Sequence, residues 1–237
     1  MSAHQILTAE AHRDVRVRTE RGAAYGDAVM TSLVVPDEFR RLAGDYPILF
    51  RLDAARDTFA AYALFGFEDG ENLFLDGERW DARVLPLAIE IQPFLIGGAE
   101  ASATKQVHID TASARIGGDE GVRLFDEDGR ATPYLDRIAE LLGALDAGYQ
   151  ASHAFFAALR KYELLEPLML DVTLDDGSEN RLSGFHTIDE DRLAELDGAA
   201  LASLNEDGHL LPLYMAVASI GRVGALVDRK NAKVRGG

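Results

Sequence analysis

The sequence predicts an α+β fold, with an antiparallel, β-rich first half followed by a long helix, a β-hairpin and two C-terminal helices. In the first half, short alternating apolar segments are separated by Gly and Asp, which is typical of half-buried strands joined by turns. Over residues 132–161, apolar residues recur every three or four positions, which indicates an amphipathic helix. Residues 168–187 place the turn sequence Asp-Asp-Gly-Ser between two apolar segments, which predicts a hairpin.

Strand patterns dominate the first half, and we expect a meander of short antiparallel strands. Pro36 suits the first position of a short helix over 36–43. In the strand predicted at 58–65, one face carries Phe59, Ala61, Ala63 and Phe65. Prolines restrict residues 83–92 to short strands or extended chain. The remaining predicted strands of this half are 14–19, 33–35, 48–52 and 73–75.

The second half begins with short strands at 106–110 and 121–125, followed by the clearest helix of the chain. Thr132 and Pro133 are a good N-cap and first helical residue. The buried stripe of this helix is predicted to include Tyr149 and Phe156, and Gly148 favours a kink. After the hairpin, Asp189 is predicted to cap another helix, and a last helix starts near Pro212.

We predict a single domain, 1–237, with two lobes. The β-rich lobe covers 13–98 and the helix-rich lobe covers 105–228. The segment between them is rich in small residues and reads as a connecting loop. The basic segment 229–237 ends in two glycines and is predicted to be a disordered tail.

The formal net charge is −16, which disfavours binding to nucleic acids and to anionic membranes. It also disfavours large homo-oligomers, so we expect a monomer or a dimer. The chain has no cysteine, so disulfides and thiolate metal sites are excluded. No signal peptide is readable at the N-terminus and no run approaches ~18 apolar residues, which predicts a cytoplasmic protein without a membrane span.

His108 and Asp110 are the most suggestive chemical pair. Residues two apart in a strand point to the same side, and His186 is available as a third ligand. Together they would form the His-x-Asp…His site of a non-haem Fe(II) oxygenase. Such sites usually lie in a double-sheet jelly roll, whereas this half is largely helical. The alternative is a surface or structural His–Asp pair, and apart from this Fe(II) hypothesis no cofactor is predicted.

Other catalytic and binding motifs are absent from the sequence. It has neither a Gly-x-Ser-x-Gly elbow nor a Gly-rich nucleotide loop. The acidic segments 126–129 and 175–177 lack the spacing of a calcium loop and are predicted to be plain turns. No catalytic residues are therefore predicted.

Several motifs resemble, in order and spacing, the SapC family of bacterial proteins, over roughly residues 30–227. The motifs are YPILF from Tyr46, ALFGFEDGENLFLDGERWDARVLP from Ala63, QPF from Gln92, HIDTASARI from His108, LFDEDG from Leu124 and LMLDVTLDDGSENRLSGFHTIDEDRLAEL from Leu168. The family pattern retains the Asp of the His-x-Asp pair more than the His, so His108 departs from it. The absence of a predicted membrane span separates this family from the peptide-transporter permease that shares its name.

The resemblance implies a context without an activity. The family is associated with bacterial surface layers, and its members occur beside TonB-dependent outer-membrane receptors, flavin-dependent halogenase-like proteins and cupin-type proteins. We therefore expect an accessory protein, held by interfaces to a protein partner from such an envelope, receptor-linked or halogenase-like system. The resemblance also allows association with the cell surface.

Residues 46–94 hold 9 of the 19 aromatic residues and are predicted to be the densest part of the core. The resemblance is also densest there, so a recognition surface is predicted from Tyr46, Phe67, Glu71, Asn72 and Trp80. The alternative is structural, with Asn72 shaping a turn and Trp80 filling the core. Three functions remain open at this point: a non-enzymatic accessory protein, the Fe(II) oxygenase, and a small-molecule-binding protein that uses an aromatic pocket.

Overall fold

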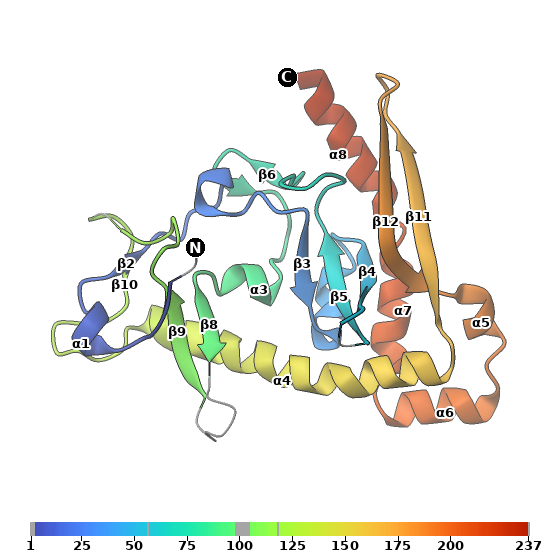
Figure 1. Cartoon of the computed structure of the whole chain (residues 1–237), viewed down its shortest axis with the longest axis horizontal. Coiled ribbons are helices and arrows are strands. Elements are labelled where there is room, and N and C mark those ends of the chain that lie inside the picture. The colour runs from blue at the N-terminus through green and yellow to red at the C-terminus, as the bar shows by residue number, and fades with distance from the viewer. Residues whose placement is uncertain (1–2, 56, 98–104, 118, 237) are drawn as a thin grey trace. The chain divides into compact units, whose positions relative to one another are not determined.

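The computed structural model describes residues 3–55, 57–97, 105–117 and 119–236. It confirms the α+β class, with helices and antiparallel sheets along the chain (Figure 1). The chain forms two compact units that interleave in sequence. Unit 1 is Met1–Ala28, Leu75–Trp80 and Leu87–Ala147, and unit 2 is Val29–Phe74, Asp81–Pro86 and Gly148–Gly237. These units differ from the lobes predicted at 13–98 and 105–228, and the connecting loop predicted between those lobes lies outside the described residues.

Unit 1 is built from short elements around the first half of a long helix, α4. A three-stranded sheet has the order β1-β9-β8, and two strand pairs, β10-β2 and β6-β7, are separate. Its buried core includes Phe94, Ile109, Leu124, Ile138 and Leu142. The elements are β1 (His4–Ile6), α1 (Ala9–His12), β2 (Arg16–Val17), η1 (Ala23–Tyr25), β6 (Leu75–Asp76), β7 (Arg79–Trp80), α3 (Leu87–Glu90), β8 (Phe94–Gly97), β9 (Gln106–Asp110), β10 (Val122–Arg123) and the start of α4 (Pro133–Lys161).

Unit 2 contains one five-stranded antiparallel sheet with the order β11-β12-β4-β5-β3. The second half of α4 and the C-terminal helices belong to the same unit. Its elements are β3 (Thr31–Val34), η2 (Pro36–Glu38), α2 (Phe39–Leu42), β4 (Ile48–Asp53), β5 (Thr58–Leu64), β11 (Leu165–Thr173), β12 (Glu179–Ile188), α5 (Glu190–Ala194), α6 (Gly198–Glu206), α7 (Leu210–Ser219) and α8 (Arg222–Gly236).

The hairpin β11–β12 joins this sheet through the pairing of His186 with Phe50 on β4. Most of the hairpin extends beyond the other three strands (Figure 1). The hairpin itself was predicted correctly. The predicted order of the N-terminal strands, a simple meander, was wrong. Strand β3 pairs with β5 and not with β4, and β4 pairs on its other side with the hairpin from the second half.

Two further local predictions in the first half are corrected. Residues 87–90 form the helix α3 instead of extended chain, and Ile91 N–H donates to the Leu87 carbonyl oxygen at 3.0 Å. The strand predicted at 73–75 begins only at Leu75, because Asn72 Oδ1 accepts the N–H of Phe74 and holds a turn there. The prolines that flank this region exclude a long strand but do not distinguish extended chain from a single helical turn.

The long helix was predicted closely, and it depends on Gly148 for its packing. Thr132 Oγ1 accepts the N–H of Leu135 at 3.4 Å, as expected of the N-cap. A Cβ at position 148 would lie 2.6 Å from Cγ2 of Val35, which is closer than such atoms approach. The glycine therefore lets Val35 of unit 2 pack directly against the helix backbone.

The C-terminal segment is helical and not the predicted disordered tail. Residues 222–236 form α8, and the basic side chains in its 229–235 part have acidic or carbonyl partners. Lys230 Nζ lies 2.6 Å from Glu71 Oε1, Arg229 pairs with Asp81 at 2.8 Å, and Lys233 donates to the Asn72 carbonyl oxygen. These ion pairs and the hydrogen bond hold the basic segment in its helical conformation.

By length and composition alone, Leu210–Gly236 is long and apolar enough to cross a membrane. Core helices of ordinary domains pass the same test when they are mostly buried, but only 22% of this apolar window is buried. Leu213, Ala216 and Leu226 are buried, and Ser219 Oγ accepts the N–H of Ile48 at 2.9 Å. The absence of a membrane span stays a prediction.

A buried ion pair organises the irregular N-terminal part of unit 1. Arg115 and Asp27 are both buried, with Arg115 Nη2 2.6 Å from Asp27 Oδ1. Arg115 also donates to the carbonyl oxygen of Glu20 at 2.7 Å, and Asp27 Oδ2 accepts the N–H of Gly22. Arg21 lies beside this pair, and burial together with the charge of Arg115 lowers the pKa of Arg21. The pair thus ties residues 20–27 to the segment around Arg115.

Replacing Gly148 with Ala should destabilise the protein by about 1–3 kcal/mol, because the added methyl group overpacks against Val35. Helix propensity alone would stabilise the variant by roughly 1 kcal/mol. Gly143→Ala is the matched control, since nothing lies within 4 Å of a Cβ there, and it should be stabilising. Urea unfolding followed by circular dichroism measures both. Equal stabilisation of the two variants would contradict the close contact.

Replacing Arg115 with Met should cost about 3–5 kcal/mol of unfolding free energy, because the buried carboxylate of Asp27 would lose the guanidinium at 2.6 Å, while Arg21 lies farther away at 3.5 Å. Arg130→Met breaks an exposed pair with Asp128 and should cost only about 0–1 kcal/mol. Chemical denaturation of the two variants compares these costs. A loss at Arg115 as small as that at Arg130 would show that the buried pair does not hold unit 1 together.

Candidate binding pocket

The register of β4 against β5 places a set of polar and small side chains on one face of the unit 2 sheet. Arg51 is opposite Ala60, and Asp53 is opposite Thr58. Cross-strand partners point to the same side, and so do residues two apart in a strand. These four side chains therefore share one face, and Tyr62, two residues beyond Ala60, lies on it as well.

The other face of the same strands packs into the core. Phe50 on β4 contacts the rings of Phe39 and Phe156, with centroid distances of 6.3 and 6.2 Å. Phe59 on β5 meets the ring of His186 edge-on at 5.0 Å. The aromatic side chains therefore hold this second face in place, and Phe59 and Ala61 of this face also line a cavity.

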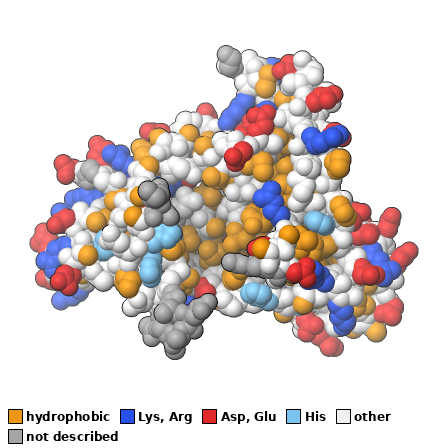
Figure 2. Space-filling model, viewed as in Figure 1, with side chains coloured by type: hydrophobic (Ala, Val, Ile, Leu, Met, Phe, Trp, Pro, Cys, Tyr) orange, Lys and Arg blue, Asp and Glu red, His pale blue; other side chains and the backbone are white. Residues whose placement is uncertain are grey.

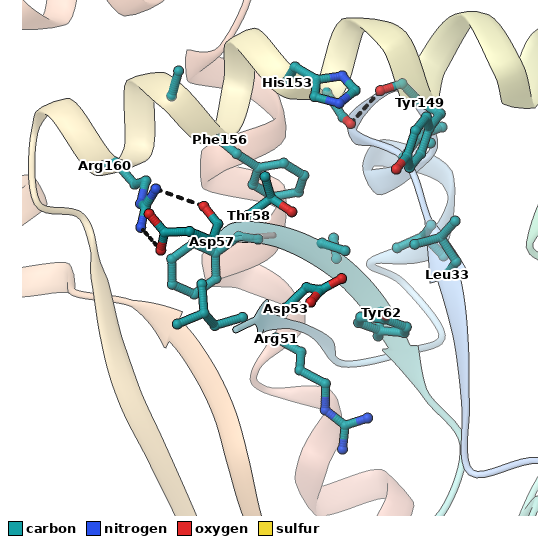
Figure 3. Close-up of a pocket in the computed structure, with 18 residues that line it drawn as sticks. Leu33, Arg51, Asp53, Asp57, Thr58, Tyr62, Tyr149, His153, Phe156 and Arg160 are labelled. Atoms are coloured by element: carbon teal, nitrogen blue, oxygen red, sulfur yellow. Dashed lines mark hydrogen bonds and ion pairs between the residues drawn. The ribbon is translucent and has the colours of Figure 1, made fainter. Parts of the chain in front are cut away.

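One side of α4 also lines this cavity, and its Phe156 and Arg160 contact Phe50 and Phe59 on the second face of the strands. Tyr149, His153, Phe156 and Arg160 follow each other at helical spacings of four, three and four residues. Tyr149, Phe156 and Arg160 lie on the side of α4 that faces the strands (Figure 3). Tyr149 was predicted to belong to the buried stripe, but 38% of its surface is exposed.

The cavity has a volume of about 560 Å³, which is within the range of pockets that bind small organic molecules. Figure 2 shows hydrophobic side chains and a basic side chain gathered over these strands. All lining residues belong to unit 2. They are Leu33, Val34, Val35, Arg51, Leu52, Asp53, Asp57, Thr58, Phe59, Ala60, Ala61, Tyr62, Tyr149, Ser152, His153, Phe156, Ala157 and Arg160.

Arg160 and Asp57 neutralise each other at the edge of the cavity. Arg160 Nη2 lies 2.6 Å from Asp57 Oδ1, and Nη1 donates to the Asp57 carbonyl oxygen at 2.9 Å (Figure 3). Asp57 has a φ of 51°, a left-handed conformation that Asp tolerates in turns. The hydrogen bond and charge of Arg160 lower the pKa of Asp57, so this carboxyl group is ionised at neutral pH.

Unlike Arg160, Arg51 contacts an aromatic ring and not a carboxylate. Its guanidinium lies 4.7 Å from the ring centroid of Phe185, in a cation–π arrangement. In the described part of the chain, no carboxylate forms an ion pair with it. Its side chain points away from α4 (Figure 3), so its donors are not directed at the helix wall of the cavity. The hydroxyl groups among the lining residues belong to Thr58, Tyr62 and Tyr149.

His153 has one ring nitrogen engaged within its own helix. Its Nδ1 lies 3.1 Å from the carbonyl oxygen of Gln150, which assigns the proton to Nδ1. The ring also meets Tyr149 edge-on at 5.3 Å. Nε2 is therefore the ring nitrogen of His153 that is not engaged by Gln150.

The five residues predicted as a recognition surface lie elsewhere and have structural contacts. Tyr46, Phe67, Asn72 and Trp80 are each no more than 8% exposed. Tyr46 donates its hydroxyl hydrogen to the Val84 carbonyl oxygen at 2.7 Å, and its ring meets that of Phe74 at a tilt, with the centroids 4.7 Å apart. Trp80 belongs to unit 1, whereas the other four belong to unit 2. These residues do not form one exposed surface.

Glu71 is half-buried and acts as a local connector. Its Oε2 accepts the N–H of Phe67 at 2.9 Å, and its Oε1 pairs with Lys230 at 2.6 Å. It therefore ties the loop before β6 to α8. The segment around Glu71 and Asn72, where the resemblance to the family is densest, therefore makes contacts that hold the fold together.

The three hypothetical iron ligands are not assembled. His108 and Asp110 lie in β9 of unit 1, whereas His186 lies in β12 of unit 2. Asp110 Oδ1 accepts the N–H groups of Ala3 and Ala112, and the bond from Ala3 lowers its pKa. Across residues 3–55, 57–97, 105–117 and 119–236, no group of three His, Asp or Glu side chains is placed to hold a metal ion.

A family model described as SapC matches residues 7–226, which is most of the chain. The chain belongs to the SapC family. This confirms the resemblance seen in the sequence motifs. No curated protein and no solved structure matches this SapC-family protein at a significant level, so its pocket is interpreted from its own residues.

The residues that line the pocket of this SapC-family protein were not predicted as a site. One usable indication was present, because the strand pattern that assigned Phe59 and Ala61 to one face leaves Thr58, Ala60 and Tyr62 on the other. Nothing in the sequence shows that these strands line a cavity together with Tyr149 and His153, which lie about ninety residues later.

Proposed function

We propose that this SapC-family protein is a non-enzymatic binding protein that holds a small organic molecule in the unit 2 pocket. The cavity of about 560 Å³ between the sheet face and α4 is the observation that carries this proposal. Ala60 lies on its sheet wall, where a larger residue would occupy the space. This favours the small-molecule alternative drawn from the sequence, although with different residues.

The lining has the composition of a binding site. Aromatic and aliphatic side chains such as Phe156, Tyr62 and Leu33 supply apolar area, while hydroxyl groups supply orientation. Tyr presents a large rigid surface and a hydrogen-bonding tip with few rotatable bonds. Burial of an apolar ligand here would be driven by about 25 cal/mol per Å² of apolar area.

We also propose that the protein acts as an accessory protein in the cytoplasm with a protein partner from an envelope, receptor-linked or halogenase-like system. Family membership supports this context. Three large apolar side chains of unit 2, Met169, Leu211 and Tyr214, are 65%, 52% and 45% exposed and would contribute to an interface. The net charge of −16 supports a protein partner over a nucleic acid.

Replacing Ala60 with Phe should weaken binding of the neutral fluorescent probe N-phenyl-1-naphthylamine by at least about ten-fold, because the new ring occupies the cavity. Fluorescence titration measures the dissociation constant. Ala151→Phe, on the opposite side of α4, is the matched control and should bind like the unmodified protein. Equal binding by all three proteins, or no binding by the unmodified protein, would refute the pocket as the binding site.

A tagged pull-down from the native bacterium, with mild crosslinking and mass spectrometry, tests the accessory role. We expect one dominant partner at near-equal amounts, because the exposed apolar side chains would be covered in a specific complex. The double variant Leu211→Glu, Tyr214→Glu should lose that partner, whereas Val122→Glu in unit 1 should retain it. Recovery of clean protein without a partner would contradict the role.

A further inference from the structure

We propose that the outer edge of strand β11 pairs with an extended, basic segment of a partner protein, which adds a further antiparallel strand to the unit 2 sheet. The inference rests on the proposed accessory role, because it names how the partner binds and which chemistry the partner presents. It concerns a different surface from the pocket beside α4.

The hydrogen bonds at the two ends of β11 show which of its main-chain groups face β12. At the turn, Leu174 N–H donates to the Ser178 carbonyl oxygen at 2.8 Å. At the other end, the Leu164 carbonyl oxygen accepts the N–H of Asp189 at 3.0 Å. The register shift midway along the hairpin places the extra residue in β12, where Gly184 has a φ of 79°, so the alternation along β11 is uninterrupted. The even-numbered residues of β11 therefore bond to β12, and the odd-numbered residues point away from it.

The odd-numbered residues Met169, Asp171 and Thr173 thus direct their N–H and C=O groups to the open edge of the sheet. Strand β11 is the outermost strand, and within the described residues no main chain pairs with it on this side (Figure 1). Such groups are the donors and acceptors with which an added strand pairs. Pro167 also occupies an outward position, where its missing N–H costs no bond to β12 and where the pairing edge ends.

The edge is held in place by the buried face of the hairpin. Val172, Leu174 and Leu182 are each no more than 7% exposed. Near the turn, Asp175 N–H donates to the side-chain oxygen of Asn231 in α8 at 2.9 Å. Because β11 is ordered before binding, only the added segment loses main-chain freedom when the two pair.

The charge of the hairpin favours a basic segment. Residues 165–188 carry five carboxylates and one arginine, a formal net charge of −4. Asp171, in the middle of the edge, pairs with that arginine, and Arg181 Nε lies 2.6 Å from Asp171 Oδ1. The other four carboxylates are Glu166, Asp175, Asp176 and Glu179. In the described part of the chain one of them, Asp175, has an ion pair, with Arg235 at 3.8 Å. Lysine or arginine side chains on an added strand would complement this field.

The same charge disfavours a second copy of this chain as the occupant. If two β11 edges paired antiparallel about the middle of 169–173, Asp171 would lie directly opposite the same residue of the other copy. Like charges in that position are destabilising. A segment of another protein with basic side chains at alternate positions avoids this repulsion.

The test uses the peptide acetyl-Lys-Val-Lys-Val-Lys-Val-Lys-amide in two N-methylated forms. Peptide residues that bond to Met169, Asp171 and Thr173 carry their side chains on the side of Asp171, which is where the lysines are expected. Methylating the main-chain nitrogens of the lysines removes the N–H groups that point to β11, whereas methylating those of the valines leaves them intact. Fluorescence anisotropy should give a dissociation constant at least about ten-fold higher for the first form than for the second.

A peptide with glutamate in place of lysine tests the charge. It should also bind at least about ten-fold more weakly than the lysine peptide, and added salt should reduce that difference.

Thr173→Pro tests the edge from the side of the protein. The proline removes an N–H that points away from β12, and Pro167 shows that β11 accommodates proline at such a position. Binding of the lysine peptide should weaken at least about ten-fold, whereas Thr173→Val keeps the N–H and should bind like the unmodified protein. In the unmodified protein, the peptide should slow amide hydrogen exchange at Met169, Asp171 and Thr173.

The outcomes separate this inference from the accessory role. Equal binding by the two N-methylated peptides, or no binding by the lysine peptide, would overturn edge pairing even if the pull-down recovers a partner. Equal binding by the glutamate peptide would overturn the basic segment. A dimer of the protein alone that Thr173→Pro dissociates would make a second copy the occupant instead. If the pull-down recovers no partner, the accessory role itself fails. Should Thr173→Pro not fold, the two N-methylated peptides still decide, because they leave the protein unchanged.

Discussion

The register of β4 against β5 is the constraint on which the pocket depends. Because side chains alternate along a strand, a slip of one residue would turn Arg51 and Asp53 into the core and bring Phe50 to the open face. The packing of Phe50 against Phe39 and Phe156 makes that slip costly, since it would expose an aromatic ring and bury a charge. The apolar core thus fixes which polar groups reach the cavity.

The cavity also depends on distant segments meeting in unit 2. Its sheet wall comes from residues 33–62 and its helix wall from residues 149–160. Gly148 lets the helix approach Val35 closely at one end, and the Arg160–Asp57 pair joins helix and strand turn at the other. The ion pair is exposed and contributes little stability, but it balances the charge of Arg160 at the edge of the cavity.

Much of the fold was predictable because local patterns carry it. The alternation in β4 and β5, the cap at Thr132 and the Asp-Gly turn of the hairpin each depend on neighbouring residues. The site was not predictable in the same way. Tyr46, Asn72 and Trp80 stood out as aromatic or turn-forming residues, yet burial makes them structural, and His186 lies in a different unit from His108. Side-chain identity alone does not report burial or long-range neighbours.

The sequence by itself determined the α+β class, most helices and strands, the membership of the SapC family and an acidic surface without cysteine chemistry. Only the tertiary structure decided that the hairpin pairs with β4, that the basic C-terminal segment is a helix tied to Glu71, and that Arg51 lines a cavity. The physical reason is the range of the interactions. Periodicity, capping and turn chemistry act over a few residues, whereas sheet order, ion-pair partners and cavities arise when segments far apart in the chain exclude water together.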